Sequence, residues 1–220
     1  AGKTTTIHIL LGLVTKTSGS INLFGLDHEK HLAAIKARIG VTPQDDNLDP
    51  DLTVAENIDF YADLYGMSRK GRRERVAELL DFSNMRPFIQ RRAGNLSGGM
   101  KQKLQLVCAL IHTPKVLLLD EPTNGLDPPA RKRMLELIRD IRDRGQTRIV
   151  LSSHLLGDVE SVCDEVLILK EYQGLTFLEI AQALDLPVST VKTRLYRGLG
   201  QLRLRLEDEG IRDAEPVPVR

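Results

Sequence analysis

A continuous apolar run that ends in two carboxylates is the feature that most restricts how this chain can fold. Residues 116–119 read VLLL, and Asp120 and Glu121 follow them directly. An apolar run without alternation is typical of a strand buried on both faces of a parallel sheet. Because such sheets bind ligands outside the carboxyl ends of their strands, the run predicts an α/β fold with two acids at a ligand-binding edge. A strand that simply ends in solvated acids is the plain alternative.

A second apolar run ends in a histidine. Residues 149–151 are expected to form another buried strand, and the letters SSH at 152–154 follow it. A lone histidine is usually structural, but the carboxyl ends of parallel strands share one edge of a sheet. We therefore expect His154 to lie close to Asp120 and Glu121.

A third, shorter run at residues 39–41 precedes Gln44. An Asp that holds Mg²⁺ and a Glu that polarises water are the groups that phosphoryl transfer requires, and Asp120 and Glu121 supply both. The amide of Gln44 is neutral, so it can bond a metal-bound water and a phosphate without adding charge.

The chain opens with AGKTTTIHILLGL, in which Gly-Lys-Thr precedes an amphipathic helical pattern. This is the back half of the phosphate-binding pattern G-x-x-x-x-G-K-[ST]. Gly2 would let the backbone approach phosphate, Lys3 would reach the β- and γ-phosphates, and the Thr4 hydroxyl would bind Mg²⁺. Thr5 would lie at the helix N-terminus, where free N–H groups favour anions. By itself the tripeptide is also compatible with an ordinary lysine near a helix start.

A second glycine-rich helix start lies in the middle of the chain. Ser97, Gly98 and Gly99 precede a helical pattern, so their backbone N–H groups are also available to an anion. Four apolar residues share one face of the expected helix: Leu104, Val107, Cys108 and Ile111.

Composition excludes several classes of protein. The 220 residues carry a formal net charge of +1, so no global charge points to nucleic acid or to acidic partners. The two cysteines are isolated in apolar surroundings, as free core thiols are. No apolar run reaches the roughly 18 residues that a membrane span needs, and no signal peptide is visible. We expect a cytoplasmic protein whose membrane role, if any, depends on a partner.

Six motifs in order make residues 1 to about 170 resemble the ATP-binding subunit of an ABC transporter. AGKTT resembles the end of Walker A, TPQDDNLDPDLTVAEN the Q-loop, and LSGGMKQ the ABC signature. LLLDEP resembles Walker B with its catalytic Glu, NGLDP the D-loop, and SSH the switch histidine. The sequences of these motifs are most similar to those of exporter subunits of the drug, nodulation-factor and ABC-2 type. The resemblance implies a P-loop NTPase-type parallel sheet with a helical subdomain at about 45–112. Within it, RKGRRERVAELLDF at 69–82 is expected to present a solvated charged face.

The resemblance also implies roles for individual residues. Mg²⁺ would be held by Asp120 and Thr4, with Gln44 sensing the nucleotide nearby. Glu121 would act as general base or orient the attacking water, and His154 would contact the γ-phosphate of ATP.

Partners follow from the same resemblance. Two copies would sandwich two ATP molecules head to tail, so that Lys3 of one copy faces the loop Ser97–Gly99 of the other. Asp127 would lie across this interface and align the two sites. A separate membrane-spanning permease would receive the signal, which places the chain at the inner face of the cell membrane.

Some features of the family are missing from the chain. The first Walker A glycine, the strands before it and the aromatic loop that stacks on adenine do not occur. Each lost charge-assisted hydrogen bond to phosphate would cost about 1.5–3 kcal/mol. The sequence therefore predicts a fragment that binds ATP poorly.

After about residue 170 the pattern changes to a helix-turn-helix. A short apolar helix, the turn DLPV and a second helix with Ser189 as N-cap are expected, and basic residues accumulate on the second helix. A helical hairpin with a basic solvated face would look the same. The wording GLTFLEIAQALDLPVSTVKTRLYRGLGQLR resembles the promoter-reading −35 region of bacterial sigma factors. It implies DNA contacts, and a possible link to RNA polymerase, through Ser189, Thr190, Lys192, Thr193, Arg194 and Arg197.

The sequence thus predicts an α/β domain at 1–170, a small all-α helix-turn-helix at 171–208 and a disordered tail at 209–220. The leading hypothesis for function is an ATP-hydrolysing export subunit. A DNA-binding module on an ATPase remnant and a non-functional chimera are the alternatives. The stretch VLILKE at 166–171 fits both halves, so two unrelated coding segments are expected to meet there.

Overall fold

The computed structural model describes residues 3–163 and 187–190. It divides the chain into one unit of Gly2–Val162 and another of Cys163–Arg220 together with Ala1. The first unit contains a parallel sheet of three strands in the order β3-β4-β5. These strands are β3 (Ile39–Thr42), β4 (Val116–Asp120) and β5 (Arg148–Ser152). The register pairs Thr42 with Leu119 and Asp120 with Ser152, so the three carboxyl ends meet at one edge.

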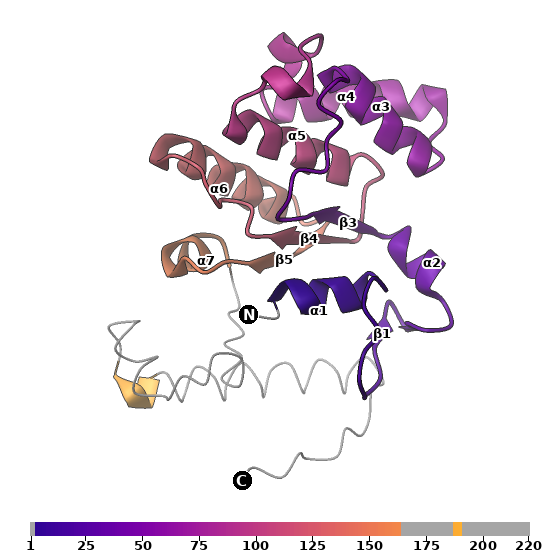
Figure 1. Ribbon diagram of the computed structural model, residues 1–220, viewed down its shortest axis with the longest axis vertical. Helices are drawn as coiled ribbons and strands as arrows, with labels where there is room; N and C mark the ends of the chain where they lie inside the picture. The colour runs from indigo at the N-terminus through magenta and orange to yellow at the C-terminus, as the bar shows by residue number, and fades with distance from the viewer. Residues whose placement is uncertain (1–2, 164–186, 191–220) are drawn as a thin grey trace. The chain divides into compact units, whose positions relative to one another are not determined.

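β4 is the buried centre of this sheet. Leu117, Leu118 and Leu119 expose 0%, 2% and 0% of their surface, which confirms a strand covered on both faces. Helix α1 (Lys3–Leu10) covers one face, while α5 (Gly98–Leu110) and α6 (Pro128–Asp143) cover the other (Figure 1). This is the α/β arrangement that the sequence predicts.

β5 differs from the expected doubly buried strand. Val150 is 50% exposed, and Arg148 is exposed as well, while Ile149 and Leu151 are half-buried. Within residues 3–163, β5 pairs only with β4, and its alternating exposure is that of an edge strand with one uncovered face. The expectation of a second fully buried strand was wrong because an apolar run does not reveal which neighbours cover it.

The face under α1 is closed by a compact apolar cluster. Ile7 of α1, Ile35 of α2 (Leu32–Lys36), Ile39 and Leu118 form it. A short antiparallel hairpin of β1 (Asn22–Leu23) and β2 (Leu26–Asp27) precedes α2. Both turn residues, Phe24 and Gly25, have positive φ, as a tight two-residue hairpin requires.

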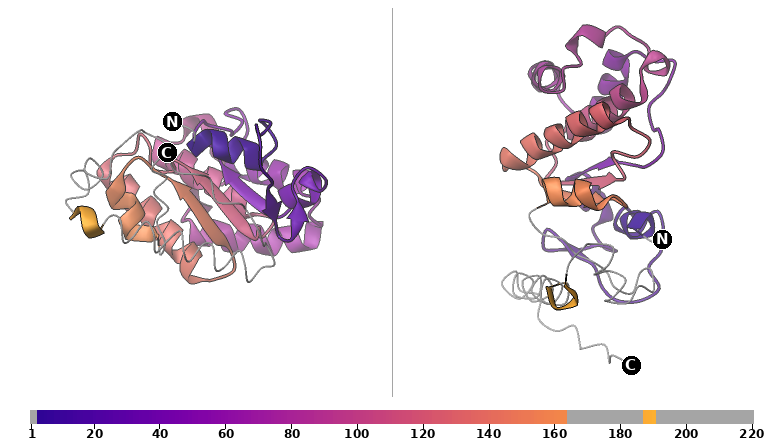
Figure 2. Two further views of the ribbon diagram at one scale, coloured as in Figure 1. Left: turned by 90° about the horizontal axis from the view of Figure 1, so that it is seen from below. Right: turned by 90° about the vertical axis from the view of Figure 1, so that its left-hand side faces the viewer.

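A helical layer lies beyond α5 (Figures 1 and 2). It consists of α3 (Val54–Leu64), α4 (Arg69–Phe82) and the short 3-10 helices η1 (Arg86–Phe88) and η2 (Ala93–Asn95). Helix α3 begins with a capping box, in which Thr53 accepts from the Glu56 N–H and the Glu56 carboxylate accepts from the Thr53 N–H. Helix α5 contacts both this layer and the sheet, and it is therefore buried beyond its one expected face, with Gln105 and Leu106 also covered.

The expected solvated face of α4 was partly wrong. The side chains of Arg72 and Arg75 are only 16% exposed. Arg72 pairs with Asp59 and Asp63 of α3, and Arg75 donates to the Leu110 carbonyl. Both guanidinium groups thus have partners within the protein, which a helical pattern alone does not reveal.

The described part of the second unit is small. Residues 188–190 are helical, and the Pro187 carbonyl accepts from the Thr190 N–H at 2.9 Å. Ser189 therefore lies inside this turn, two residues after Pro187, and the expectation that it is the N-cap was wrong. The other expected DNA contacts, Lys192, Thr193, Arg194 and Arg197, lie outside the described residues.

Candidate active site

The carboxyl edge of the sheet brings the predicted acids and histidine together. Asp120 is the last residue of β4, and Glu121 follows it. Ser152 is the last residue of the neighbouring strand β5 and pairs directly with Asp120. His154 follows, just before α7 (Leu156–Val162). Each apolar run ends where its strand leaves the sheet, so the polar residues that follow the runs lie together at this edge.

Glu121 is the centre of the site. Its carboxylate lies 3.2 Å from the Lys3 ammonium and 2.7 Å from Nδ1 of His154, and it also accepts the backbone N–H of His154 at 3.2 Å. Glu121 is 8% exposed, so these partners compensate for the loss of water around a buried charge. Three residues that are distant in sequence thus form one connected chain, as the sequence predicts.

The backbone of Glu121 is strained. Its φ is +51°, a left-handed conformation that is uncommon for a residue with a β-carbon. The Glu121 N–H donates to both the carbonyl and the hydroxyl of Ser152, each at 3.1 Å, and these bonds hold the conformation. Strain of this kind is concentrated at functional sites, where surrounding structure keeps a side chain in place.

Ser152 has a role that the sequence reading missed. Its hydroxyl donates to Oδ1 of Asp120, a carboxylate that is only 3% exposed. One serine therefore holds the Asp120 carboxylate through its hydroxyl, and the Glu121 backbone through its carbonyl and that same hydroxyl. In the sequence, Ser152 is only a polar residue at the end of an apolar run. The strand register is needed to show that it pairs with Asp120.

Helix α1 supplies the predicted phosphate-binding side chains. Lys3 lies in its first turn and reaches Glu121, Thr4 is half-buried and Thr5 is exposed. Gly2 lies outside the described residues. The carboxylate of Glu121 is the partner of the Lys3 ammonium.

Two other predicted groups, Gln44 and Asp127, are not joined to this chain of contacts. Gln44 lies just beyond β3, is exposed and has no recorded side-chain partner within residues 3–163. Asp127 accepts from the Ala130 N–H and so acts as the N-cap of α6. This capping bond gives Asp127 a structural role that is independent of any other contact it makes.

The loop Ser97–Gly99 forms the start of α5. Ser97 and Gly98 are exposed, and the Ser97 side chain makes no capping bond with the first N–H groups of α5. A β-carbon on Gly99 would lie 3.0 Å from that of Ala130, whereas one on Gly98 would meet nothing within 4 Å. The loop is thus open on its outer side and tightly packed against α6 on its inner side.

The donor set suits a magnesium nucleotide better than a metal held by protein alone. Within the described residues, no three His, Cys, Asp or Glu side chains come together as metal ligands. Magnesium is commonly bound through one or two carboxylates together with phosphates of the substrate. Asp120 could supply the carboxylate and the Thr4 hydroxyl a further oxygen, while the Lys3 ammonium could pair with the phosphates.

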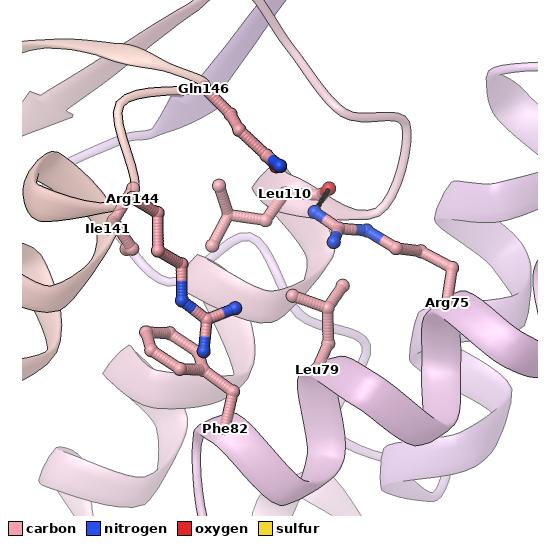
Figure 3. Close-up of a pocket in the computed structure, with 7 residues that line it drawn as sticks. All are labelled: Arg75, Leu79, Phe82, Leu110, Ile141, Arg144 and Gln146. Atoms are coloured by element: carbon pink, nitrogen blue, oxygen red, sulfur yellow. Dashed lines mark hydrogen bonds between the residues drawn. The ribbon is translucent and has the colours of Figure 1, made fainter.

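A separate hollow lies between α4 and the end of α6 (Figure 3). Leu79, Leu110 and Ile141 line it, and the guanidinium groups of Arg75 and Arg144 border it. Both arginines already pair with Glu78, at 2.7 and 3.2 Å, and Arg144 also stacks on Phe82. Because its charges are paired internally, this hollow is a seam between helices and not the nucleotide site.

The fold and the edge chemistry together define a nucleotide-binding α/β domain of the P-loop class. The family model described as ABC transporter matches residues 1–124, and the chain therefore belongs to the ABC transporter family. It carries the ABC-type ATPase domain of that family. A second family model, sigma-70 region 4, matches residues 163–202. Both matches agree with the two resemblances that the motifs indicate.

Curated relatives support the first of these matches. The chain is 44% identical over 171 residues to a Nod factor export ATP-binding protein I of Burkholderia orbicola, covering 78% of this chain and 56% of the relative. It is 43% identical over 178 residues to the probable multidrug ABC transporter ATP-binding protein YbhF of Escherichia coli, covering 79% of this chain and 30% of the relative. The chain thus spans little more than half the length of the first of these relatives.

Solved structures share the fold. The structure of an ATP-binding subunit of an ABC transporter superposes with a TM-score of 0.69 at 28% identity, over 89% of this chain and 83% of the other. A dimeric post-hydrolysis state of the ATP-binding cassette MJ0796 with ADP and phosphate gives 0.64 at 26% identity, over 73% of each chain. Among the described residues, no helix is both long and apolar enough to cross a membrane.

Proposed function

We propose that this chain is the ATP-binding and ATP-hydrolysing subunit of an ABC exporter, which drives transport through a separate membrane permease. The observation that carries the proposal is the contact chain from Lys3 through the buried carboxylate of Glu121 to His154 at the carboxyl edge of the sheet. The relative named for Nod factor export supports the direction of transport.

In this proposal Lys3 binds the terminal phosphates of ATP and thereby releases Glu121 from its ion pair. Glu121 then accepts a proton from the attacking water, while the His154 ring holds the carboxylate in place. Asp120 and Thr4 would hold Mg²⁺, with Gln44 beside it, and the ion would neutralise charge on the phosphates. Thr5 and Gly2 complete the phosphate-binding helix start.

A second copy of the chain completes the site. The open loop Ser97–Gly99 of one copy would offer its N–H groups to the nucleotide held by Lys3 of the other. Asp127, at the start of the neighbouring helix α6, would align the two copies. The dimeric cassette with ADP and phosphate supports this arrangement.

The proposal predicts that Glu121→Gln abolishes turnover while ATP binding remains. The amide keeps the size of the side chain but cannot accept the proton, so kcat should fall about 10²- to 10⁴-fold. Magnesium-dependent phosphate release and nucleotide binding are measured on the full chain. Glu136→Gln, on the partly exposed surface of α6, is the matched control and should keep wild-type turnover. Equal turnover in Glu121→Gln and wild type would overturn the proposal.

The match of residues 163–202 to sigma-70 region 4 favours a second candidate function, DNA binding by the tail. Contacts from Ser189, Thr190, Lys192, Thr193, Arg194 and Arg197 would be responsible. A DNA reader that contacts phosphates loses affinity steeply as salt rises. Titration of the full chain with duplex DNA at several salt concentrations tests this; no binding at low salt would reject it.

A further inference from the structure

The segments that follow Glu121 and His154 are linked a second time, inside the protein. Thr123 lies two residues after Glu121, and its hydroxyl donates to Oδ2 of Asp158. Asp158 lies four residues after His154, in the first turn of α7, and is only 1% exposed. The contact between Glu121 and His154 is thus backed by a buried hydrogen bond between the same two segments.

Arg131 completes this buried group. Its Nε and one terminal nitrogen lie 2.6 and 2.5 Å from Oδ1 of Asp158. Arg131 lies in the first part of α6, the helix that Asp127 caps. A carboxylate this deeply buried is stable only when its oxygens are paired, and here both oxygens have partners. Asp158 therefore joins the segments after Glu121 and His154 to the start of α6.

The far end of α7 is held in another way. Arg139 donates to the Ser161 carbonyl at 3.0 and 3.3 Å, and Arg142 donates to the Val162 carbonyl at 3.1 Å. These bonds attach α7 to α6 without touching Thr123 or Asp158. The contacts of Asp158, which join the segments of the site, are therefore distinct from those of Arg139 and Arg142, which only attach the end of α7 to α6.

We propose that Asp158 is a positioning residue of the ATPase site, acting together with Thr123 and Arg131. It keeps His154 at hydrogen-bonding distance from Glu121 and fixes both relative to the start of α6. Asp158 itself is too deeply buried to touch the nucleotide. This inference rests on the proposed function for its kinetic consequences, but its geometric consequence at His154 does not.

Thr123→Val tests the inference, because valine keeps the shape of threonine and removes only the hydroxyl. Small displacements of catalytic groups can reduce rates about 100-fold, so we expect kcat to fall about 10- to 100-fold. The KM for ATP should stay within about twofold of wild type. Asp158→Asn, which weakens the pairing with Arg131, should act in the same direction.

Arg139→Met is the matched control, since it removes a bond between the same two helices away from Thr123. It should lower thermal stability and leave kcat near the wild-type value. If Thr123→Val and Arg139→Met lower stability equally and kcat equally, Asp158 is merely structural and the inference is overturned.

A second readout needs no turnover. In protein with isotope-labelled histidine, the ring signals of His154 should shift in Thr123→Val, while those of His112 should not. An unmoved His154 signal would overturn the inference. If the wild-type chain hydrolyses no ATP but the His154 signal shifts, the proposed function fails and the positioning role of Asp158 stands.

Discussion

His112 shows how one residue can connect two layers of the protein. Its ring stacks on Tyr65 with centroids 3.5 Å apart, and its Nε2 lies 3.2 Å from the Ile39 carbonyl. Nδ1 is buried without a hydrogen-bond partner. Burial lowers the pKa of His112 from 6.5 to about 4, and the nearby Arg75 charge adds to this, while the Ile39 bond opposes it. The ring is therefore neutral at pH 7.

The lowered pKa of His112 predicts a loss of stability in acid. Above pH 6.5 the ring is neutral in both the folded and the unfolded chain. As the pH falls from 6.5 towards 4, the unfolded chain binds a proton that the folded chain does not, so the free energy of unfolding decreases. His112→Phe keeps the stack on Tyr65 and removes the titration.

Urea unfolding at several pH values checks this prediction. At pH 7 the variant should be less stable by about 1 kcal/mol, because it loses the hydrogen bond to Ile39. The difference from wild type should then shrink as the pH approaches 4. Parallel pH profiles for the two proteins would show that His112 is not responsible.

At the scale of elements, the packing of α5 on β3 depends on a missing side chain. A β-carbon on Gly40 would lie 2.2 Å from the Ala109 carbonyl oxygen, which belongs to the backbone and cannot rotate away. The φ of Gly40 is not in the left-handed region, so the constraint is one of space. The glycine allows the helix that carries Ser97 to lie close to the sheet.

Gly40→Ala should therefore lower the free energy of unfolding by about 1–3 kcal/mol or more, as overpacked cores do. Gly71→Ala is the control, because Gly71 is helical and an added β-carbon meets only Ser68 at an ordinary 3.6 Å. That variant should gain up to about 1 kcal/mol from its higher helix propensity. Denaturant unfolding of both variants measures the contrast, and equal stabilities would contradict it.

At the scale of the whole molecule, the proposed function divides the nucleotide contacts between two copies of the chain. Lys3 and Glu121 lie together at the sheet edge, whereas the loop Ser97–Gly99 belongs to the start of α5 and faces solvent. In the proposed arrangement, the loop of a second copy supplies the contact opposite Lys3. ATP should therefore drive association of the Glu121→Gln variant, in which nucleotide is not consumed.

Sedimentation with and without Mg²⁺ and ATP tests this association. The Glu121→Gln variant should sediment as a dimer only with nucleotide. Adding Ser97→Glu should keep it monomeric, because a negative charge would then face the phosphates. Ser97 is exposed and makes no capping bond with its side chain, so this substitution should leave the fold stable. Dimers that form equally without ATP, or despite Ser97→Glu, would contradict the prediction.

By itself the sequence determined the class of fold and most of the candidate site. The run at 116–119 predicted β4, and Asp120, Glu121 and His154 were expected at one edge because the carboxyl ends of parallel strands must meet there. These inferences succeed because they depend on local periodicity and on a rule that holds for all parallel sheets.

Only the tertiary structure decided which groups orient that site. Nothing in the local pattern pairs Ser152 with Asp120, turns the Glu121 backbone to positive φ or buries Asp158 between Thr123 and Arg131. The same holds for the half-exposed face of β5. Each of these features depends on which distant segments are neighbours in the fold. Residues that act through such contacts produce no periodic pattern in the sequence.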